Sequence, residues 1–474
     1  MPADFSACLA RVDESLKNYI ESFPEDGACM EGLGYYTYGM SYYMNYVVES
    51  ENILGSQIQY AQNSGAVQEW EYVSPSHRKE DTICPDIMLP ENFCKIAEFP
   101  QKCFFPDGRT VSFSDGDSHD KYRMGLMAAL ARYDAAVQFP PVSSAAGVHT
   151  DSCYRFVELK MDLFEPEQYL ERNVRNHNVV VQDFVIKPVN EWKLGSCRSQ
   201  ENSCQQSGVN SVSGSLFVFS TAQWCIAHSK NEIGFACKGG HNNEPHNHND
   251  IGHFIYEAGG VMFLTDLGAG EYTSDYFGKK RYEILCNSSL GHSVPIMNGK
   301  SQRQGEDFRC EDFSVELLAD KKQILSDAPE KKPKTSEEMV VEQYCERIAR
   351  IRMEIGAAYG LEPDAMIRTF RFHMDSGLLE VEDFSNLQSA FTENLITQIP
   401  PRIEENRIYL EQGNLCVVVG IEDKENICEE NYIRIVEETH RNHHGEDETV
   451  YAIQWDTVGA TVYKVIFRKN NESE

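Results

Sequence analysis

Two histidines and an aspartate stand at alternate positions in the stretch His246-Asn247-His248-Asn249-Asp250. In an extended strand, alternate side chains share one face, so this spacing predicts that the three groups point the same way. Two imidazoles and a carboxylate on one face suit metal binding or proton transfer far better than core packing. The sequence therefore indicates an active site at this stretch.

A predicted β-hairpin follows these histidines. The apolar runs 254–256 and 261–264 flank Gly259-Gly260, and a Gly-Gly pair between apolar runs is a good hairpin signal. The second run leads to Asp266, which we expect the hairpin to return toward the histidines. A second part of the site is expected at Gly291-His292-Ser293.

The bulk composition indicates a globular protein of about two domains. The chain has 474 residues, of which 41% are hydrophobic and 25% are charged, which is ordinary for a globular protein. No apolar stretch approaches the roughly 20 residues needed to cross a bilayer. The start at residues 1–5 lacks the basic and apolar regions of a secretory signal. We therefore expect a cytoplasmic protein with no membrane partner.

Cysteine usage indicates the redox compartment, and the net charge indicates which classes of partner are excluded. The 15 cysteines include no Cys-x-x-Cys pair, which fits buried thiols in a reducing compartment better than a disulfide framework. The net charge of −31 repels nucleic acid and anionic lipid on average. We expect no nucleic-acid partner, although local cations could still bind an anionic substrate.

The first third of the chain has a helical pattern. Apolar residues spaced three and four apart predict a helix over 9–23, a second is predicted from about 31 to 49, and a third over 121–139. The stretch 74–120, rich in Pro, Asp and Gly, is expected to be mostly irregular. A weaker helix is expected at 166–176.

The remainder of the chain has a strand pattern. A strand is expected at 178–185 and a long polar loop at 194–214. From residue 215, short strands without intervening helices favour an all-β sandwich. They are predicted at 216–220, 224–228, 235–238, 254–256, 261–265, 366–373, 378–384, 408–410, 415–421 and 462–467. The sequence thus predicts a helical domain over 1–178, a linker over 179–211 and a β domain over 212–474.

Several segments resemble the heparinase II/III-like proteins, which are polysaccharide lyases and relatives. Three segments of the β domain carry the resemblance: 240–250, 264–268 and 291–295. In the helical part, Glu25-Asp26-Gly27 and Glu31-Gly32-Leu33-Gly34-Tyr35-Tyr36-Thr37-Tyr38-Gly39 are similar to the stretch that carries the family's catalytic tyrosine. The resemblance implies an α+β multidomain fold, an (α/α) toroid followed by an antiparallel β-sandwich.

In one respect this sequence departs from the pattern of the family. In the family, an Asn or His on an earlier toroid helix neutralises the substrate carboxylate. The residues before Tyr36 contain no histidine and one asparagine, Asn18. We therefore expect an incomplete, shortened toroid.

By this resemblance, His248, Asp266 and His292 occupy the zinc-ligand positions, and His246 occupies the position of the catalytic histidine. Tyr36 aligns best with the catalytic tyrosine, with Tyr35 and Tyr38 as alternatives. Chemistry agrees with the metal assignment, since two neutral imidazoles and one carboxylate suit zinc and leave a fourth position for water. The zinc is expected to be largely structural.

The activity that the resemblance implies is β-elimination at a uronic acid in an oligosaccharide or polysaccharide. One group must remove the C5 proton and another must protonate the departing O4 oxygen, roles assigned here to His246 and Tyr36. Arg281 is a candidate for binding the substrate carboxylate, because a guanidinium can bind it through two hydrogen bonds.

Two other interpretations remain open. A non-catalytic glycan-binding relative would fit the shortened toroid. A cupin-like metal enzyme would fit the His-x-His pair, but it is disfavoured because the first glutamate after His248 is the distant Glu257.

Overall fold

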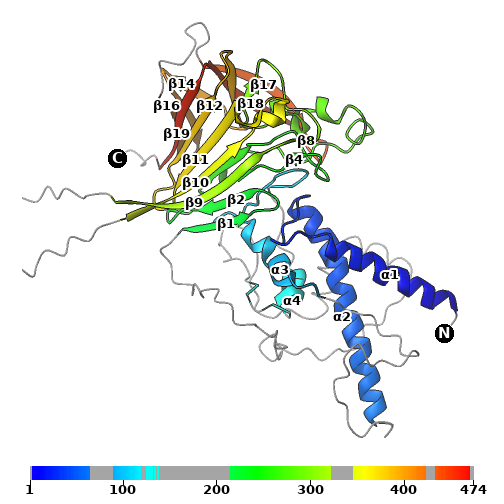
Figure 1. Cartoon of the computed structure of the whole chain (residues 1–474). Coiled ribbons are helices and arrows are strands. Elements are labelled where there is room, and N and C mark those ends of the chain that lie inside the picture. Colours follow the sequence, from blue (N-terminus) through cyan, green and yellow to red (C-terminus); the bar gives the residue numbers. More distant parts are fainter. Residues whose placement is uncertain are drawn as a thin grey trace, which may run out of the picture. The chain divides into compact units, whose positions relative to one another are not determined.

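A computed structural model describes residues 3–63, 89–118, 214–321, 345–422 and 433–469, and most of 124–137. The chain divides into two compact units (Figure 1). The helical unit comprises Met1–Cys29, Leu33–Cys103 and Asp120–Gln205, and the β-rich unit comprises Met30–Gly32, Phe104–His119 and Gln206–Glu474. Two short pieces of the region that the sequence assigned to the helical domain therefore belong with the strands. The elements expected at 166–176 and 178–185, and the linker at 179–211, lie outside the described residues.

The helical unit contains α1 (Ala3–Glu21), α2 (Leu33–Asn63), α3 (Phe93–Lys102) and α4 (Met124–Ala131). The helices predicted at 9–23 and 31–49 are confirmed, the second extending further than expected. Within the stretch 74–120 the structure describes residues 89–118, which are irregular as expected apart from helix α3. This helix has only ten residues and contains Pro100, so its sequence signal is weak.

Helix α2 presents one face to the core of its unit. Its buried residues recur at steps of three and four, the spacing that places side chains on one side of a helix. They include Leu33, Tyr36, Met40, Met44 and Val47. This pattern explains why an aromatic-rich stretch forms a helix here.

The β-rich unit is built from antiparallel sheets. An eight-stranded sheet has the order β14-β15-β16-β19-β12-β11-β10-β9, a five-stranded sheet β1-β2-β3-β5-β6, a four-stranded sheet β17-β18-β13-β7 and a two-stranded sheet β4-β8. The strands up to β9 are β1 (Ser215–Phe219), β2 (Trp224–His228), β3 (Ile233–Lys238), β4 (His241–Asn242), β5 (Phe254–Ala258), β6 (Val261–Leu264), β7 (Ile296–Met297), β8 (Gly305–Arg309) and β9 (Glu311–Lys321). The later ones are β10 (Cys345–Glu354), β11 (Met366–His373), β12 (Leu379–Ser385), β13 (Phe391–Thr397), β14 (Pro401–Glu404), β15 (Arg407–Gln412), β16 (Leu415–Ile421), β17 (Arg434–Arg441), β18 (Asp447–Thr457) and β19 (Ala460–Lys469).

The sheets pack through a shared aromatic and aliphatic core. The ring of Phe235 on β3 lies 5.3 Å from that of Phe370 and 5.4 Å from that of Phe372, both on β11. The ring of Trp455 on β18 lies 5.3 Å from that of Tyr463 on β19. The five- and four-stranded sheets thus both contact the eight-stranded sheet, and the prediction of an antiparallel, β-rich domain is confirmed.

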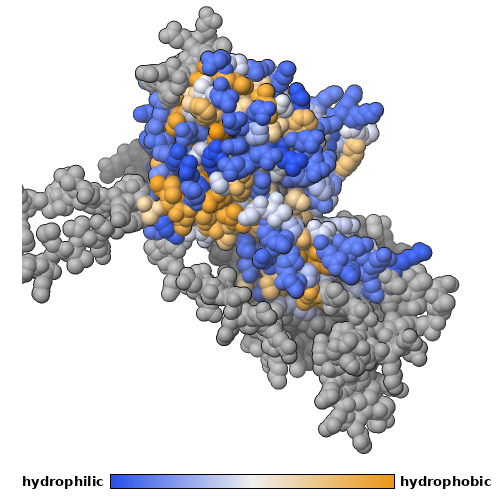
Figure 2. Space-filling view, in the orientation of Figure 1, coloured by the Kyte–Doolittle hydropathy of each residue, from blue (hydrophilic) through white to orange (hydrophobic). Residues whose placement is uncertain are grey.

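The face of the β-rich unit seen in Figure 2 is largely polar, with several apolar areas, one of them low on the unit. Val218 on β1 and Leu317 and Leu318 on β9 are exposed. The cysteines that the structure describes form no disulfide. No helix in the described ranges combines the length and the apolar character that a membrane crossing requires.

Candidate metal centre

The stretch from Asn243 to His253 is a loop, which corrects the prediction of an extended strand. His246 has a φ of 57°, in the left-handed region that breaks strand geometry. The backbone N–H of Asn247 donates to the carbonyl of Glu244 and closes a turn. Alternation therefore does not align the three groups: Asp250 lies 2.9 Å from the buried ammonium of Lys238.

The predicted hairpin of β5 and β6 is confirmed, with Gly259 and Gly260 at its turn. It delivers Asp266 to a fully buried position. Just beyond, Gly268 has a φ of 60°, and a Cβ there would lie 2.2 Å from the carbonyl oxygen of Gly116. Only glycine fits this close approach, which joins the segment after β6 to the segment 104–119.

Three buried side chains converge as the sequence predicted: His248, Asp266 and His292. Their potential ligand atoms all lie within 4.8 Å of one another. His248 Nδ1 is 3.3 Å from His292 Nε2, which is 3.8 Å from Asp266 Oδ2. The group could hold a metal ion, because a cation can satisfy acceptors brought this close together.

The hydrogen bonds of the two histidines fix which nitrogens carry lone pairs. His248 Nε2 lies 3.0 Å from a carboxylate oxygen of Asp115, and His292 Nδ1 lies 2.9 Å from the carbonyl of Ser288. Both of these nitrogens must donate, so in the neutral rings His248 Nδ1 and His292 Nε2 are acceptors. Burial lowers the pKa of His292 to about 4, which keeps this ring neutral near pH 7.

Asp266 adds a carboxylate to these two acceptors. Its buried Oδ2 faces the Nε2–H of His253, whose Nδ1 accepts the backbone N–H of Ser293, while its Oδ1 accepts from the backbone N–H of Gly268 at 2.8 Å. Although burial opposes ionisation, the neighbouring His253 and His292 hold the pKa of Asp266 well below its usual range. His253 Nε2 lies 3.3 Å from Oδ2. A buried carboxylate facing two imidazole lone pairs has the chemistry of a divalent-metal site.

Asp115 is the functional residue that the sequence analysis missed. Its buried carboxylate lies between two histidines, with Oδ2 2.8 Å from His246 Nδ1 and Oδ1 3.0 Å from His248 Nε2. Burial opposes ionisation, but the hydrogen bonds to His246 and His248, with the charge of Arg281, hold the pKa of Asp115 far below its usual range. One ionised carboxylate therefore orients both His248, a candidate metal ligand, and His246.

His246 is the accessible member of this cluster. Its side chain is 26% exposed, and its Nε2 lies 3.7 Å from a carboxylate oxygen of Glu31. Because Nδ1 faces Asp115, Nε2 carries the lone pair when the ring is neutral. This arrangement allows His246 to accept a proton from a bound molecule.

Two tyrosines also contact Asp115. Tyr276 is fully buried and donates to Oδ1. Tyr272 donates to Oδ2 at 3.3 Å, the oxygen that faces His246, and is 37% exposed. Only Tyr272 of this pair therefore combines contact with Asp115 and access to solvent.

The structure gives Arg281 different partners from those expected. Its Nη2 lies 3.0 Å from Asp115 Oδ1 and 3.1 Å from the carbonyl of Asn247, and its Nη1 lies 3.3 Å from the carbonyl of Tyr276. The guanidinium also stacks 4.5 Å from the Tyr276 ring centre. These contacts hold the loop of His246 and His248 against Asp115.

Tyr36 lies in the core of the helical unit. It is 0% exposed, and its hydroxyl donates to the carbonyl of Ile96 at 2.8 Å. Burial raises the pKa of this phenol well above its usual value. Of the two alternatives, Tyr35 is partly exposed and Tyr38 is 59% exposed. The position of Tyr36 is that of a packing residue.

Comparison with known proteins identifies the fold. No family model and no curated protein sequence matches the chain. A crystal structure of heparinase III matches with a TM-score of 0.51 at 12% identity, over 99% of this chain and 57% of that one. A heparan sulfate lyase mutant from Pedobacter heparinus matches with a TM-score of 0.47 at 13% identity, over 81% of this chain and 47% of that one. The chain spans about half the length of these proteins and shares a fold with heparinase III.

Proposed function

We propose that this protein is a metal-containing lyase that cleaves uronate-containing glycans by β-elimination. The observation that carries the proposal is the carboxylate of Asp115, which contacts both His246 and His248. It couples a partly exposed imidazole, suited to proton transfer, to a buried acceptor set suited to a metal. The fold shared with heparinase III supports the same class of chemistry.

His246 acts as the base in this proposal. Elimination requires removal of the proton at C5 of a uronic acid, whose carbanion delocalises into the adjacent carboxylate. Asp115 holds the Nδ1–H of His246, so the lone pair of the neutral ring lies on Nε2, which accepts that proton. The carboxylate also stabilises the imidazolium that forms, as in other Asp–His pairs.

The proposed metal is zinc, held by His248, Asp266 and His292. Two nitrogens and one oxygen are a common zinc set. Bound zinc would supply the positive charge that the converging lone pairs lack, and would fix the 246–250 loop, the end of the hairpin and His292 relative to one another. Its role is structural, and the proton transfers belong to side chains.

Tyr272 takes the place of Tyr36 as the proton donor to the departing oxygen. Tyr36 uses its hydroxyl within its own core, whereas Tyr272 is partly exposed and contacts the same Asp115 oxygen as His246. Arg281 positions Asp115 and the histidine loop in this proposal and leaves substrate binding to other groups. The helical unit is proposed to be part of an incomplete (α/α) toroid.

The test is a screen of uronate polymers and oligomers for an unsaturated product, which is detected by its ultraviolet absorbance. His246→Ala is expected to lower the rate by about 10²–10⁴-fold without loss of metal. His241→Ala is the matched control, since His241 precedes the same loop and has no role in the mechanism. Undiminished activity in His246→Ala, or no unsaturated product from any uronate polymer, would refute the proposal. A glycan-binding protein without activity would instead show saturable binding alone.

A further inference from the structure

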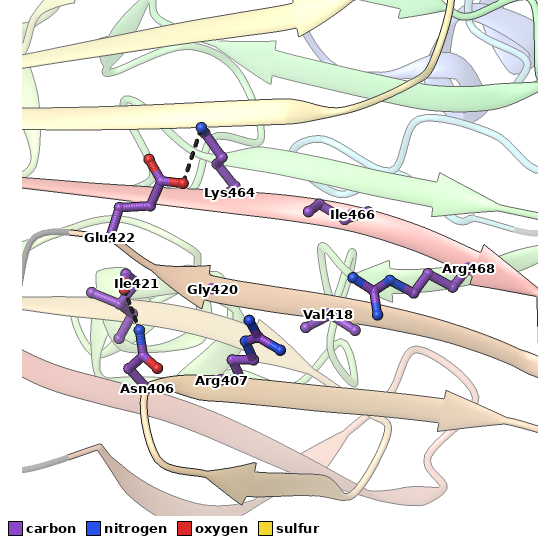
Figure 3. Close-up of a pocket in the computed structure, with 9 residues that line it drawn as sticks. All are labelled: Asn406, Arg407, Val418, Gly420, Ile421, Glu422, Lys464, Ile466 and Arg468. Atoms are coloured by element: carbon purple, nitrogen blue, oxygen red, sulfur yellow. Dashed lines mark hydrogen bonds and ion pairs between the residues drawn. The ribbon is translucent and has the colours of Figure 1, made fainter. Parts of the chain in front are cut away.

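A hollow of about 500 Å³ lies on the eight-stranded sheet, over β15, β16 and β19 (Figure 3). None of its lining residues belongs to the segments that carry His246 or the metal group. A volume of this size is in the range that small-molecule sites occupy. The hollow is therefore a separate candidate for ligand binding.

The hollow exists because one position of the sheet lacks a side chain. Gly420 on β16 pairs with Arg407 on β15 and with Lys464 on β19, so the three form one row across the strands. A Cβ at Gly420 would meet no other heavy atom within 4 Å. Val418 and Ile466, which form the next row, supply an apolar floor.

The charges around the hollow are unbalanced. Lys464 pairs with Glu422 and Glu380, but Arg407 and Arg468 have no carboxylate partner among the residues that the structure describes. Other arginines of this sheet are paired, including Arg350 with Glu316, Arg371 with Glu382 and Arg402 with Glu411. In a chain of net charge −31, two unpaired guanidinium groups beside one hollow favour an anionic ligand.

We propose that this hollow binds an acidic saccharide, with carboxylate or sulfate groups held by Arg407 and Arg468. Figure 3 shows Val418 between the two guanidinium groups, where the face of a sugar ring can lie on the apolar floor. Arg407 pairs with Gly420 and Arg468 with Cys416, so the two arginines lie two strands apart and four residues apart along the strand direction. Their backbones are thus separated by roughly 17 Å, a span that several consecutive sugar units can bridge. The choice of a uronate glycan rests on the proposed function, whereas the preference for an anion rests on the arginines.

The test measures polymer binding by affinity electrophoresis of the full chain in gels that contain alginate, hyaluronan or heparan sulfate, with neutral dextran as the reference. Gly420→Val fills the hollow and suits a strand, so its folding stability should not fall. Gly420→Val and the double variant Arg407→Ala with Arg468→Ala are each expected to weaken the apparent affinity at least about tenfold, the effect of losing a charge-assisted contact. Arg371→Ala, which removes a paired arginine of the same sheet, is the matched control and should bind as the wild type does.

The outcomes separate this inference from the proposed function. Wild-type affinity in both Gly420→Val and the double arginine variant would overturn the inference, as would equal retardation by dextran and by the acidic polymers, or no retardation at all. Binding that depends on Gly420 and the arginines, in a chain that forms no unsaturated product, would remove the proposed function and leave the binding site. Formation of unsaturated product, with binding that does not depend on Gly420 or the arginines, would support the proposed function and remove the binding site.

Discussion

Two buried charged clusters of the β-rich unit differ in where their positive charge comes from. In the first, Arg368 lies between Asp383 and Glu393, with nitrogen–oxygen distances of 2.7 and 3.1 Å. In the second, His248, Asp266 and His292 bring acceptors together without a donor among them. Both are shielded from water, so charge must be compensated locally in each. The first contains its own cation, Arg368, and the second is a group that could hold a metal ion.

The two clusters are also connected through the backbone. Nη1 of Arg368 donates to the carbonyl of Gly252 at 2.9 Å and to that of Ser293 at 2.7 Å. These carbonyls lie next to His253 and His292. The guanidinium thus ties together two of the segments that carry the acceptor set, so the first cluster supports the geometry of the second.

Removing the cation of the first cluster should have the largest effect on stability. Arg368→Met leaves two buried carboxylates uncompensated, and we expect a loss of about 3–5 kcal/mol in the free energy of unfolding. Urea denaturation of the wild type and the variant measures it. Arg368→Lys, which keeps the charge but loses hydrogen bonds, should fall between them. Addition of zinc should rescue neither variant, and equal stability of all three proteins would contradict this account.

His228 lies outside both clusters, and its lowered pKa predicts how the free energy of unfolding depends on pH. Burial lowers the pKa of His228 to about 4, against a hydrogen bond with the backbone of Phe104 that raises it. The unfolded chain binds this proton near pH 6.5, so acid favours unfolding, and stability rises from pH 4 to 6.5 by up to about 3 kcal/mol.

His228→Phe isolates this contribution, because the side chain lies among the rings of Phe105 and Phe217. Between pH 7 and pH 5, the wild type should lose about 2 kcal/mol more than the variant. The measurement is urea denaturation at both pH values. Parallel losses would show that His228 does not titrate in this range.

Metal removal tests the second cluster directly. We expect one zinc per chain by elemental analysis, and a chelator should lower the free energy of unfolding by about 2.7 kcal/mol relative to free zinc at 100 times its dissociation constant. His248→Ala should abolish both the bound metal and the response to chelator. His228→Ala removes a half-buried imidazole elsewhere and should keep both, so retention of metal by His248→Ala would exclude the proposed ligand set.

The candidate metal group was predictable from the family resemblance together with local signals, whereas the contact that brings Asp115 to it was not. The Gly259-Gly260 turn and the spacing of His248, Asp266 and His292 are visible in the sequence. Asp115 becomes a partner only through a contact between backbone segments far apart in the chain, that of Gly116 with Gly268, which no pattern near Asp115 reports.

Backbone and core geometry account for the other differences from expectation. The left-handed conformation of His246 replaced the strand that alternation predicted. A run of tyrosines on one helix does not show which rings face the core, and Tyr36 and Tyr43 proved to be buried.

Tyr36→Phe should have the smallest effect, and it separates packing from chemistry. The variant keeps the ring, which lies 5.3 Å from that of Phe99, and loses only the hydrogen bond to Ile96. We expect a loss of about 1 kcal/mol in the free energy of unfolding and an unchanged rate of product formation. Tyr272→Phe should show the reverse, a rate at least about tenfold lower with unchanged stability, because its hydroxyl contacts Asp115 at the partly exposed His246. A large loss of activity in Tyr36→Phe with full stability would return the proton-donor role to the helical unit.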